Sequence, residues 1–357
     1  MAGYHVKDLL FLFLIFLLTI NCNVQSSAGV QLEEPCVFEN PIGSGADPWV
    51  YKKDGYYYFS KSQGGGVYIS KSENLTDILG GLQKVWEQPV QGWNASNLWA
   101  PELHYIQGNW YIYYTAGKSG PPFIHQRSGV LKALTDDPLG EYEDKGMLYT
   151  GDDIETGEEY TWAIDLTVLE TDDQLYAIWS GWEENKDDHR TTQHLYIAAM
   201  ENPWTISSNR VKISSPVENW ETGTELAINE GPQILKNKDE EIFIIYSASE
   251  SWLPAYNLGQ LRLKGHDADP MNAKNWIKEG PVFQGSDQVY GVGHASYTTS
   301  PDGEENWIVY HTKVRPEPGW ERVIHMQPFT WHEDGSPYFG TPLQPGITTA
   351  KPSGQCK

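Results

Sequence analysis

Five segments of the chain each place one ionisable side chain inside an otherwise apolar, strand-like run. These side chains are Asp47, Glu102, Asp165, Glu230 and His294. The run around Glu230 is the most distinctive, because Leu-Ala-Ile-Asn precedes the carboxylate and Gly-Pro follows it. Burial disfavours the charged form of a carboxyl group, so Glu230 is a candidate proton donor near neutral pH. Taken alone, a glutamate at a strand end that is satisfied by an arginine or by backbone amides fits the same pattern.

Several carboxylates around one pocket suit either a divalent-cation cage or acid–base hydrolysis. Hydrolysis of a glycosidic bond needs one protonated carboxyl as the acid and one ionised carboxylate that activates water. Asp47 lies between Gly-Ala and Pro-Trp, where we expect a more solvated position, and it is the candidate base. Asp165 is expected to raise the pKa of Glu230 by like-charge repulsion and to orient it. Glycine and alanine flank His294, which leaves room for a ligand or water, with a satisfied buried histidine as the alternative.

The elements that carry these residues repeat five times. Each repeat has an apolar strand with one polar residue, a tight Asp, Gly or Asn turn, and an aromatic-rich second strand, which are the signals of a β-hairpin. The polar residues follow one another at intervals of 55, 63, 65 and 64 residues. Each repeat has room for two further strands. A period near 60 predicts an all-β protein, a five-bladed β-propeller with about four antiparallel strands per blade.

The propeller geometry predicts a single site at one mouth of the central axis. The first strand of every blade lines that axis, so we expect the five ionisable residues to converge there, with a purely structural polar ring as the alternative. Arg322 lies beyond the fifth hairpin and could hold a carboxylate through a bidentate pair, or be an ordinary surface arginine. Four tryptophans could form the floor under a sugar ring or belong to the core: Trp49, Trp99, Trp162 and Trp182.

Length and charge narrow the class of protein. The chain has 357 residues and a net charge of −23, and this length suits two average domains or one large all-β domain. The negative charge argues against nucleic acid and against an anionic membrane surface, because no basic patch is present to bind either. A neutral polymer remains a suitable partner for a chain with 15 Trp and 21 Tyr.

The N-terminus has the pattern of a secretory signal. Lys7 precedes an apolar run over residues 9–18, and small residues follow up to Ala28. The run is too short to span a bilayer, so we expect a signal peptide over residues 1–28, a single catalytic propeller domain over residues 29–357, and an extracellular location. An uncleaved anchor is the alternative.

The cysteines and two sequons add expectations about the mature chain. Cys22 would leave with the signal, and Cys36 and Cys356 would remain at opposite ends. They can pair if the termini meet in space, and two free thiols are the alternative. Asn74 and Asn94 begin glycosylation sequons, which suggest surface loops.

Together these segments resemble glycoside hydrolase family 43, the five-bladed β-propeller enzymes that act on arabinose- and xylose-containing polysaccharides. The resemblance spans about residues 40–345 and implies inversion at the anomeric carbon, with Asp47 as general base, Glu230 as general acid and Asp165 as the residue that tunes and orients the acid. It rests on five motifs: Gly45-Ala46-Asp47-Pro48, Trp99-Ala100-Pro101-Glu102, Ala163-Ile164-Asp165, Asn229-Glu230-Gly231-Pro232 and Gly293-His294-Ala295.

The resemblance also implies a cation and a set of substrate contacts. Family members commonly hold a cation, often Ca²⁺, on the axis near the histidine that matches His294, frequently through waters. No organic cofactor is expected. Arg315 competes with Arg322 for the position of the active-site arginine. The expected substrate-binding residues are Trp99, Glu102, Trp162 and Arg322.

The expected function is that of a secreted α-L-arabinofuranosidase, monomeric and with exo action on α-1,5-arabinan of plant cell walls as the favoured mode. The motif Leu98-Trp99-Ala100-Pro101-Glu102 is similar to that of the arabinan-acting members. The lack of the β-sandwich domain that family xylosidases often carry is also expected of those members. Endo-arabinanase, β-xylosidase, a retaining fructan-acting relative and a non-catalytic carbohydrate-binding propeller are the alternatives. Loops over residues 117–127 and 182–192 are expected to shape the mouth.

Overall fold

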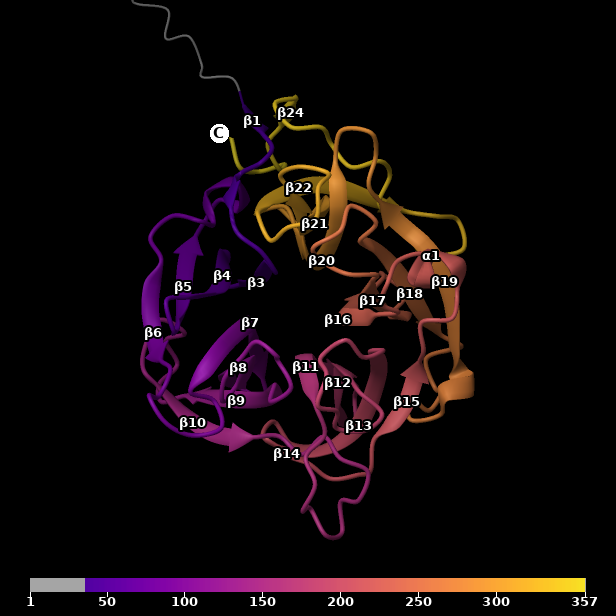
Figure 1. Cartoon of the computed structure of the whole chain (residues 1–357). Helices are drawn as coiled ribbons and strands as arrows, with labels where there is room; N and C mark the ends of the chain where they lie inside the picture. The colour runs from indigo at the N-terminus through magenta and orange to yellow at the C-terminus, as the bar shows by residue number, and fades with distance from the viewer. Residues whose placement is uncertain (1–35, 357) are drawn as a thin grey trace, which may run out of the picture. The chain divides into compact units, whose positions relative to one another are not determined.

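The computed structural model describes residues 36–356, which form five antiparallel β-sheets arranged as blades around one axis (Figure 1). This confirms the predicted all-β, five-bladed β-propeller. The predicted signal peptide over residues 1–28, and Cys22 with it, lies outside the described residues. Within residues 36–356, no helix is long and apolar enough to cross a membrane.

Blades I to IV are each built from consecutive strands, and the first strand of each blade is innermost (Figure 1). A short helix, α1 (Asn219–Thr222), precedes blade IV, and two 3₁₀ turns cover Leu75–Asp77 and Ala273–Asn275. Blade I contains β3 (Trp49–Lys53), β4 (Tyr56–Gln63), β5 (Gly66–Ser72) and β6 (Gln83–Glu87); blade II contains β7 (Ser96–Ile106), β8 (Asn109–Gly117), β9 (Arg127–Ala133) and β10 (Tyr142–Met147). Blade III contains β11 (Ala163–Glu170), β12 (Leu175–Gly181), β13 (His194–Asn202), β14 (Thr205–Ile206) and β15 (Val211–Ser214); blade IV contains β16 (Asn229–Lys236), β17 (Ile242–Ala248), β18 (Asn257–Leu263) and β19 (Trp276–Gln284).

Blade V joins the two ends of the propeller. Its inner strands are β20 (Tyr290–Thr299), β21 (Asn306–Lys313) and β22 (Arg322–Trp331), with β23 (Pro337–Tyr338) beside β22, but its outer strand is β2 (Gly43–Ser44) from the other end of the chain. Next to it, β1 (Val37–Glu39) pairs with β24 (Thr348–Ala350). Cys36 and Cys356 form a disulfide with their Cα atoms 5.9 Å apart, which confirms the expected pairing. The ring is therefore closed by two strand pairings and one covalent bond.

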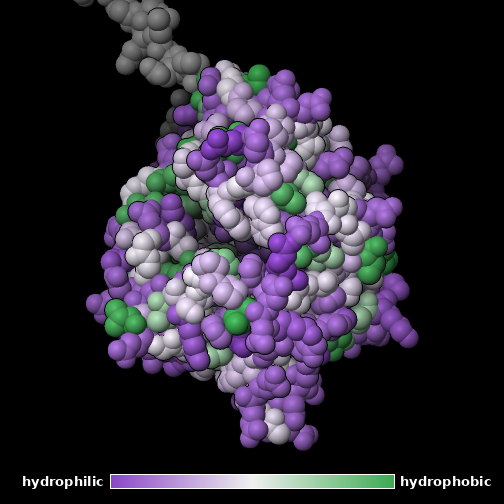
Figure 2. Space-filling model, viewed as in Figure 1, coloured by the Kyte–Doolittle hydropathy of each residue, from purple (hydrophilic) through white to green (hydrophobic). Residues whose placement is uncertain are grey.

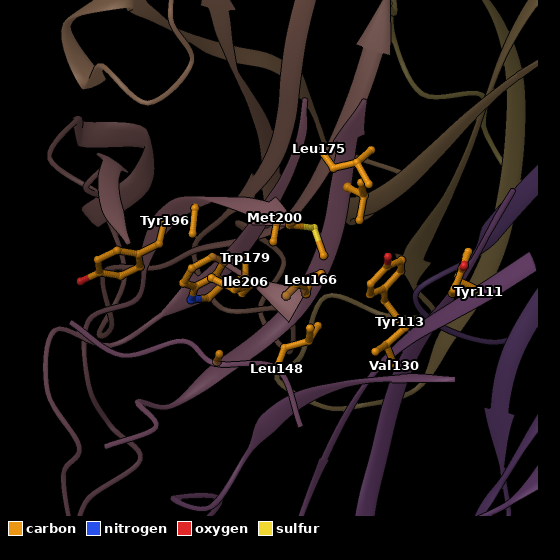
Figure 3. Packing of buried hydrophobic residues seen from close by; sticks show 14 of the residues in the cluster. Tyr111, Tyr113, Val130, Leu148, Leu166, Leu175, Trp179, Tyr196, Met200 and Ile206 are labelled. Carbon is orange, nitrogen blue, oxygen red and sulfur yellow. The ribbon is translucent and has the colours of Figure 1, made fainter. Parts of the chain in front are cut away.

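Hydrophobic clusters lie between neighbouring blades and set their relative positions. Figure 3 shows the cluster between blades II and III, to which Tyr113 and Val130 contribute from blade II and Leu166 and Trp179 from blade III. All four side chains are buried. Burying one large apolar side chain stabilises a fold by about 1.5–3 kcal/mol. Such clusters hold the inner strands, and hence the ionisable residues on them, in place around the axis.

The inner strands β7, β11, β16 and β20 each contain a shift in pairing register near the same mouth of the axis. At these bulges Ala100, Asp165, Gly231 and His294 have left-handed backbone conformations, and Asp47 has one just before β3. A left-handed conformation costs a residue other than glycine about 1–2 kcal/mol. Strain of this kind concentrates at functional sites, and here it turns the side chains from the normal strand alternation.

The two sequon asparagines, which were expected in surface loops, differ in their exposure. Asn94 is buried, and its side-chain amide donates to the Tyr114 hydroxyl (2.8 Å) and to Asp144 (3.0 Å), so the expectation of a surface sequon is wrong there. Asn74 is half-buried beside the first 3₁₀ turn. The face in Figure 2 is mostly hydrophilic, as the net charge suggests, and it is hollowed near its centre.

Candidate active site

One cavity of about 600 Å³ collects most of the ionisable residues predicted from the sequence. Asp47, Asp165, Glu230, His294 and Arg322 all line it. They come from four blades: Asp47 lies just before β3, Asp165, Glu230 and His294 lie within the inner strands β11, β16 and β20, and Arg322 begins β22. The volume is within the range of about 300–1,000 Å³ that is typical of small-ligand sites.

Asp47 lies among cationic and hydrogen-bonding groups. Its Oδ1 accepts a hydrogen bond from Nη1 of Arg322 (3.2 Å) and lies 3.4 Å from Nδ1 of His294. Its amide donates to Nδ1 of His311 (3.2 Å). Burial, the largest single influence, would raise the pKa of Asp47, but Arg322, His294 and His311 together outweigh it and hold the pKa well below its usual range. Asp47 is therefore ionised, as a general base must be.

Glu230 has the opposite electrostatic environment. It is 8% exposed, and the Tyr256 hydroxyl donates to its Oε1 (2.8 Å). Burial is the main cause that raises the pKa of Glu230 to about 7, and the charge of Asp47 adds to it, while the hydrogen bond from Tyr256 acts against it. A carboxyl that keeps its proton near neutral pH can act as a general acid. The sequence contained no signal that pointed to Tyr256.

Asp165 contacts the backbone beside the acid. Its Oδ2 accepts from the amide of Gly231 (3.1 Å), and burial, followed by the charges of Glu230 and Asp47, raises its pKa to about 8. We expected Asp165 to be the charge that raises the pKa of Glu230, but burial and Asp47 are the stronger causes there, and the pKa of Asp165 is itself raised. Repulsion between two carboxylates is mutual, so the pair retains a proton more readily than either carboxyl would alone.

A buried polar network supports the strand that carries Glu230. The side chain of Asn229 donates to Glu221 (2.8 Å) and accepts from the Ser214 hydroxyl (2.7 Å). Glu221 is fully buried and is paired with Lys278 at 2.8 Å. This network fixes the start of β16 from behind, on the side away from the cavity residues.

Aromatic side chains form the floor and walls of the cavity. Trp162 lines it and stacks on Trp182 (4.4 Å between centroids), which lies underneath and is fully buried. Trp99 lines it as predicted, whereas Trp49 contacts the ring of His104 and lines a second cavity further along the axis. Loops that sequence reasoning only delimited, or missed, add four wall residues: Phe123, His189, Trp252 and Trp320.

Glu102 is not among the residues that line this cavity. Its two carboxylate oxygens are bonded to Gln233 (2.5 Å) and His104 (3.0 Å). The bulge of β7 puts Ala100, two residues earlier, at the position equivalent to Asp165, so Glu102 lies deeper along the axis. Arg315, the competitor of Arg322, is exposed and paired with Glu321.

His294 was expected to lie beside an axial cation. Its Nδ1 is 3.4 Å from Asp47 and 4.0 Å from Asp165, and its ring covers Gly231, where a Cβ would lie 3.1 Å from the ring. Across residues 36–356, no group of three His, Cys, Asp or Glu side chains has an arrangement that could hold a metal ion. The residues do not fit a directly ligated metal, and we derive no step through one. A water-mediated Ca²⁺ stays a prediction.

Known proteins resemble this chain over most of its length. Residues 38–337 match the model of the family described as "Glycosyl hydrolases family 43". The extracellular exo-alpha-(1->5)-L-arabinofuranosidase of Streptomyces avermitilis is 31% identical over 88% of the chain, and alpha-L-arabinofuranosidase 43 of Humicola insolens is 31% identical over 86%. The chain spans only 65% and 63% of the lengths of those two relatives.

A solved structure agrees with the sequence relatives. The alpha-L-arabinofuranosidase from Lactobacillus brevis aligns with a TM-score of 0.77 and 31% identity, over 87% of this chain and 98% of that one. The convergence of the strained inner-strand residues, the family match and this structural likeness agree. The chain therefore belongs to glycosyl hydrolases family 43.

Proposed function

We propose that this protein is a secreted, inverting α-L-arabinofuranosidase that releases terminal arabinofuranosyl residues from α-1,5-linked arabinan. The observation that carries the proposal is the split between two carboxyl groups in one cavity: Asp47 is ionised, and the pKa of Glu230 is raised to about 7. Inverting hydrolysis requires such a base and acid. The names of the Streptomyces and Humicola relatives support the arabinofuranoside substrate, and the word extracellular in the former supports secretion.

The mechanism transfers two protons around a single displacement. Asp47 accepts a proton from a water molecule that forms a bond to the anomeric carbon, while Glu230 gives its proton to the glycosidic oxygen as that bond breaks. Arg322 holds Asp47 ionised before the step, and the Tyr256 hydroxyl orients the acid. Asp165 holds the backbone next to the acid through its bond to the Gly231 amide.

The shape of the cavity supports exo action. Its wall residues come from the loops of four different blades, Phe123 from blade II, His189 from blade III, Trp252 from blade IV and Trp320 from blade V. Walls on four sides of a cavity that is open at its mouth favour a chain end over a continuous polymer. Endo action is the second candidate, because a relative from Aspergillus niger named probable arabinan endo-1,5-alpha-L-arabinosidase C is 41% identical over 78 residues.

The decisive variants are Glu230→Gln and Asp47→Asn. We expect Glu230→Gln to lower kcat on debranched arabinan by about 10²–10⁴-fold, with less effect on a substrate whose leaving group needs no protonation. Asp47→Asn should be inactive on both, since water still needs its base. An exposed glutamate in the turn between β20 and β21 provides the matched control, Glu304→Gln, which should keep wild-type rates.

Product analysis completes the test. NMR of the first-formed anomer should show inversion, and chromatography should show arabinose from the outset, whereas mixed oligosaccharides would indicate endo action. Wild-type turnover of arabinan by Glu230→Gln would refute the assignment of the acid. Xylose released from xylo-oligosaccharides at a higher kcat/KM than arabinose from arabino-oligosaccharides would replace the proposed substrate with a β-xyloside.

A further inference from the structure

Two loops from neighbouring blades meet beside the acid. Trp252 lies between β17 and β18 of blade IV, and Trp320 lies between β21 and β22 of blade V. The amide of Gly319 donates to the carbonyl of Trp252 (2.9 Å), and the two indole rings lie 5.1 Å apart at an angle of 46°. Lys313 also bonds the carbonyl of Gly319 (2.7 Å). The two rings therefore form a joint wall that is tied to both blades.

Trp320 is unusual in its exposure. All 15 tryptophans of the chain lie within the described residues, and Trp320, at 61%, is the most exposed of them. It nevertheless lines the cavity. Indole rings combine a large apolar face with a polar edge and are usually covered in folded proteins. An indole held in place by a tied loop, but left uncovered at the edge of a reaction cavity, is suited to be covered by a ligand.

The position of this wall indicates which sugar of a bound substrate would contact it. Tyr256, which holds Glu230, ends the same loop that carries Trp252. Trp252 therefore lies on the loop whose last residue holds the acid, and a leaving group that receives the proton of Glu230 would lie next to this loop. Trp99, Phe123 and Trp162 line the cavity from blades II and III and remain for the sugar that is cleaved off.

The chemistry of the wall favours an uncharged ring. Two cationic side chains lie close to it, and both are already engaged: the guanidinium carbon of Arg322, 5.6 Å from the centroid of Trp320, belongs to a group paired with Asp47, and Lys313 donates to the carbonyl of Gly319 and does not line the cavity. Among the cavity-lining residues, no unpaired lysine or arginine lies beside the wall to bind an anionic ligand. The C–H face of a neutral sugar can cover an indole face and leave its hydroxyl groups in water.

We propose that Trp252 and Trp320 form the platform for the leaving-group sugar, and that this platform gives the enzyme its preference for oligosaccharides over substrates with small leaving groups. The inference rests on the proposed arabinofuranosidase function and names a specificity determinant that neither family motif nor relative assigns. It gives Trp320 a binding role on the leaving-group side, distinct from the residues that perform the chemistry.

Kinetics of Trp320→Ala and Trp320→Phe test the platform. With α-1,5-arabinotriose, kcat/KM should fall about 10- to 50-fold in Trp320→Ala, mainly through KM, since this range is of the order expected when one large apolar side chain loses its cover. Trp320→Phe should retain most of the rate, because it keeps an aromatic face. With α-L-arabinofuranosyl fluoride, which has no leaving-group sugar but still needs the base, both variants should stay within about twofold of wild type.

Comparison with arabinofuranosyl fluoride separates a binding role of Trp320 from an effect on the residues that perform the chemistry. Equal losses on both substrates would show that Trp320 acts through Arg322 and Asp47, and no loss on the triose would show that nothing binds there; either result overturns the proposal. A second readout does not depend on turnover. In Glu230→Gln, arabinotriose should blue-shift the tryptophan emission, and adding Trp320→Phe should make this shift smaller, because the other tryptophans of the cavity still respond to the bound sugar. A shift of undiminished size refutes the platform. Inactivity of the wild type on both arabinosyl substrates would refute the proposed function. In that case the platform is tested by the same fluorescence titration with xylotriose in place of arabinotriose.

Discussion

The hydrogen bond from Tyr256 to Glu230 leads to a prediction about pH dependence. The hydroxyl donates to Oε1 at 2.8 Å, and this donation favours the ionised carboxylate and lowers its pKa against the effect of burial. Tyr256→Phe removes the donor but keeps the ring, which packs against Gly293 and stacks on His311. The pKa of the acid should therefore rise, and the basic limb of kcat/KM, where the acid loses its proton, should move to higher pH.

The magnitude follows from the energy of a charged hydrogen bond. Such bonds contribute about 1.5–3 kcal/mol, and about 1.4 kcal/mol corresponds to one unit of pKa. Taking the lower end, because part of the loss is recovered by water in the open cavity, the basic limb should move up by about one pH unit from a starting point near 7. A less acidic donor also transfers its proton more slowly, so the rate at the optimum should fall about threefold.

The assay is a pH profile of kcat/KM on arabinotriose for wild type and Tyr256→Phe. The matched control is Tyr310→Phe, which removes a buried hydroxyl bonded to Gln327 (2.8 Å) and leaves that acceptor a second donor, the Leu343 amide. The control should lose some stability and keep both limbs of its profile. A basic limb that stays in place in Tyr256→Phe, or moves to lower pH, would refute the assigned role of the hydroxyl.

Three further predictions concern two ion pairs and the disulfide that closes the ring of blades. Arg322→Met should raise the pKa of Asp47, so the acid limb of kcat/KM should move to higher pH; an unchanged limb would show that Arg322 does not set the ionisation of the base. Lys278→Met leaves Glu221 buried without its cation and should lower the free energy of unfolding by about 3–5 kcal/mol. Urea denaturation should show a greater loss at pH 8 than at pH 5, because Glu221 without Lys278 takes up a proton at lower pH; an equal loss at both values would contradict the ion pair. Reducing the disulfide should lower the stability by about 2–5 kcal/mol in thermal melts, and no change would show that the two strand pairings close the ring unaided.

The repeat was readable in the sequence because each blade begins with a local pattern. An apolar strand, a tight turn and an aromatic strand are each formed by contiguous residues. The interval at which this pattern repeats can therefore be counted in the sequence without any knowledge of tertiary contacts. This is why Asp47, Asp165, Glu230 and His294 could be placed at one mouth of the axis, and the structure does bring them together. Arg322 followed from its position after the fifth hairpin.

Glu102 shows where pattern reasoning failed. It was aligned with Asp165 by spacing, but β7 has its bulge at Ala100, and a bulge inserts an extra residue that changes which side chains face the cavity. The position of a bulge depends on the partner strand as well as on the bulged strand itself, so the intervals alone could not locate it. The outer strand of blade V was missed for a related reason, since β2 comes from the other end of the chain.

The sequence by itself determined the all-β class, the number of blades and the inner-strand residues available for acid–base chemistry, because these depend on local periodicity. Only the tertiary structure decided which carboxyl keeps its proton, since the pKa values of Asp47 and Glu230 depend on burial and on charges contributed by other blades. It also decided which aromatic residues surround the cavity. Tyr256, Trp252 and Trp320 lie in loops without periodicity, and their positions arise from contacts between segments that are distant in the sequence.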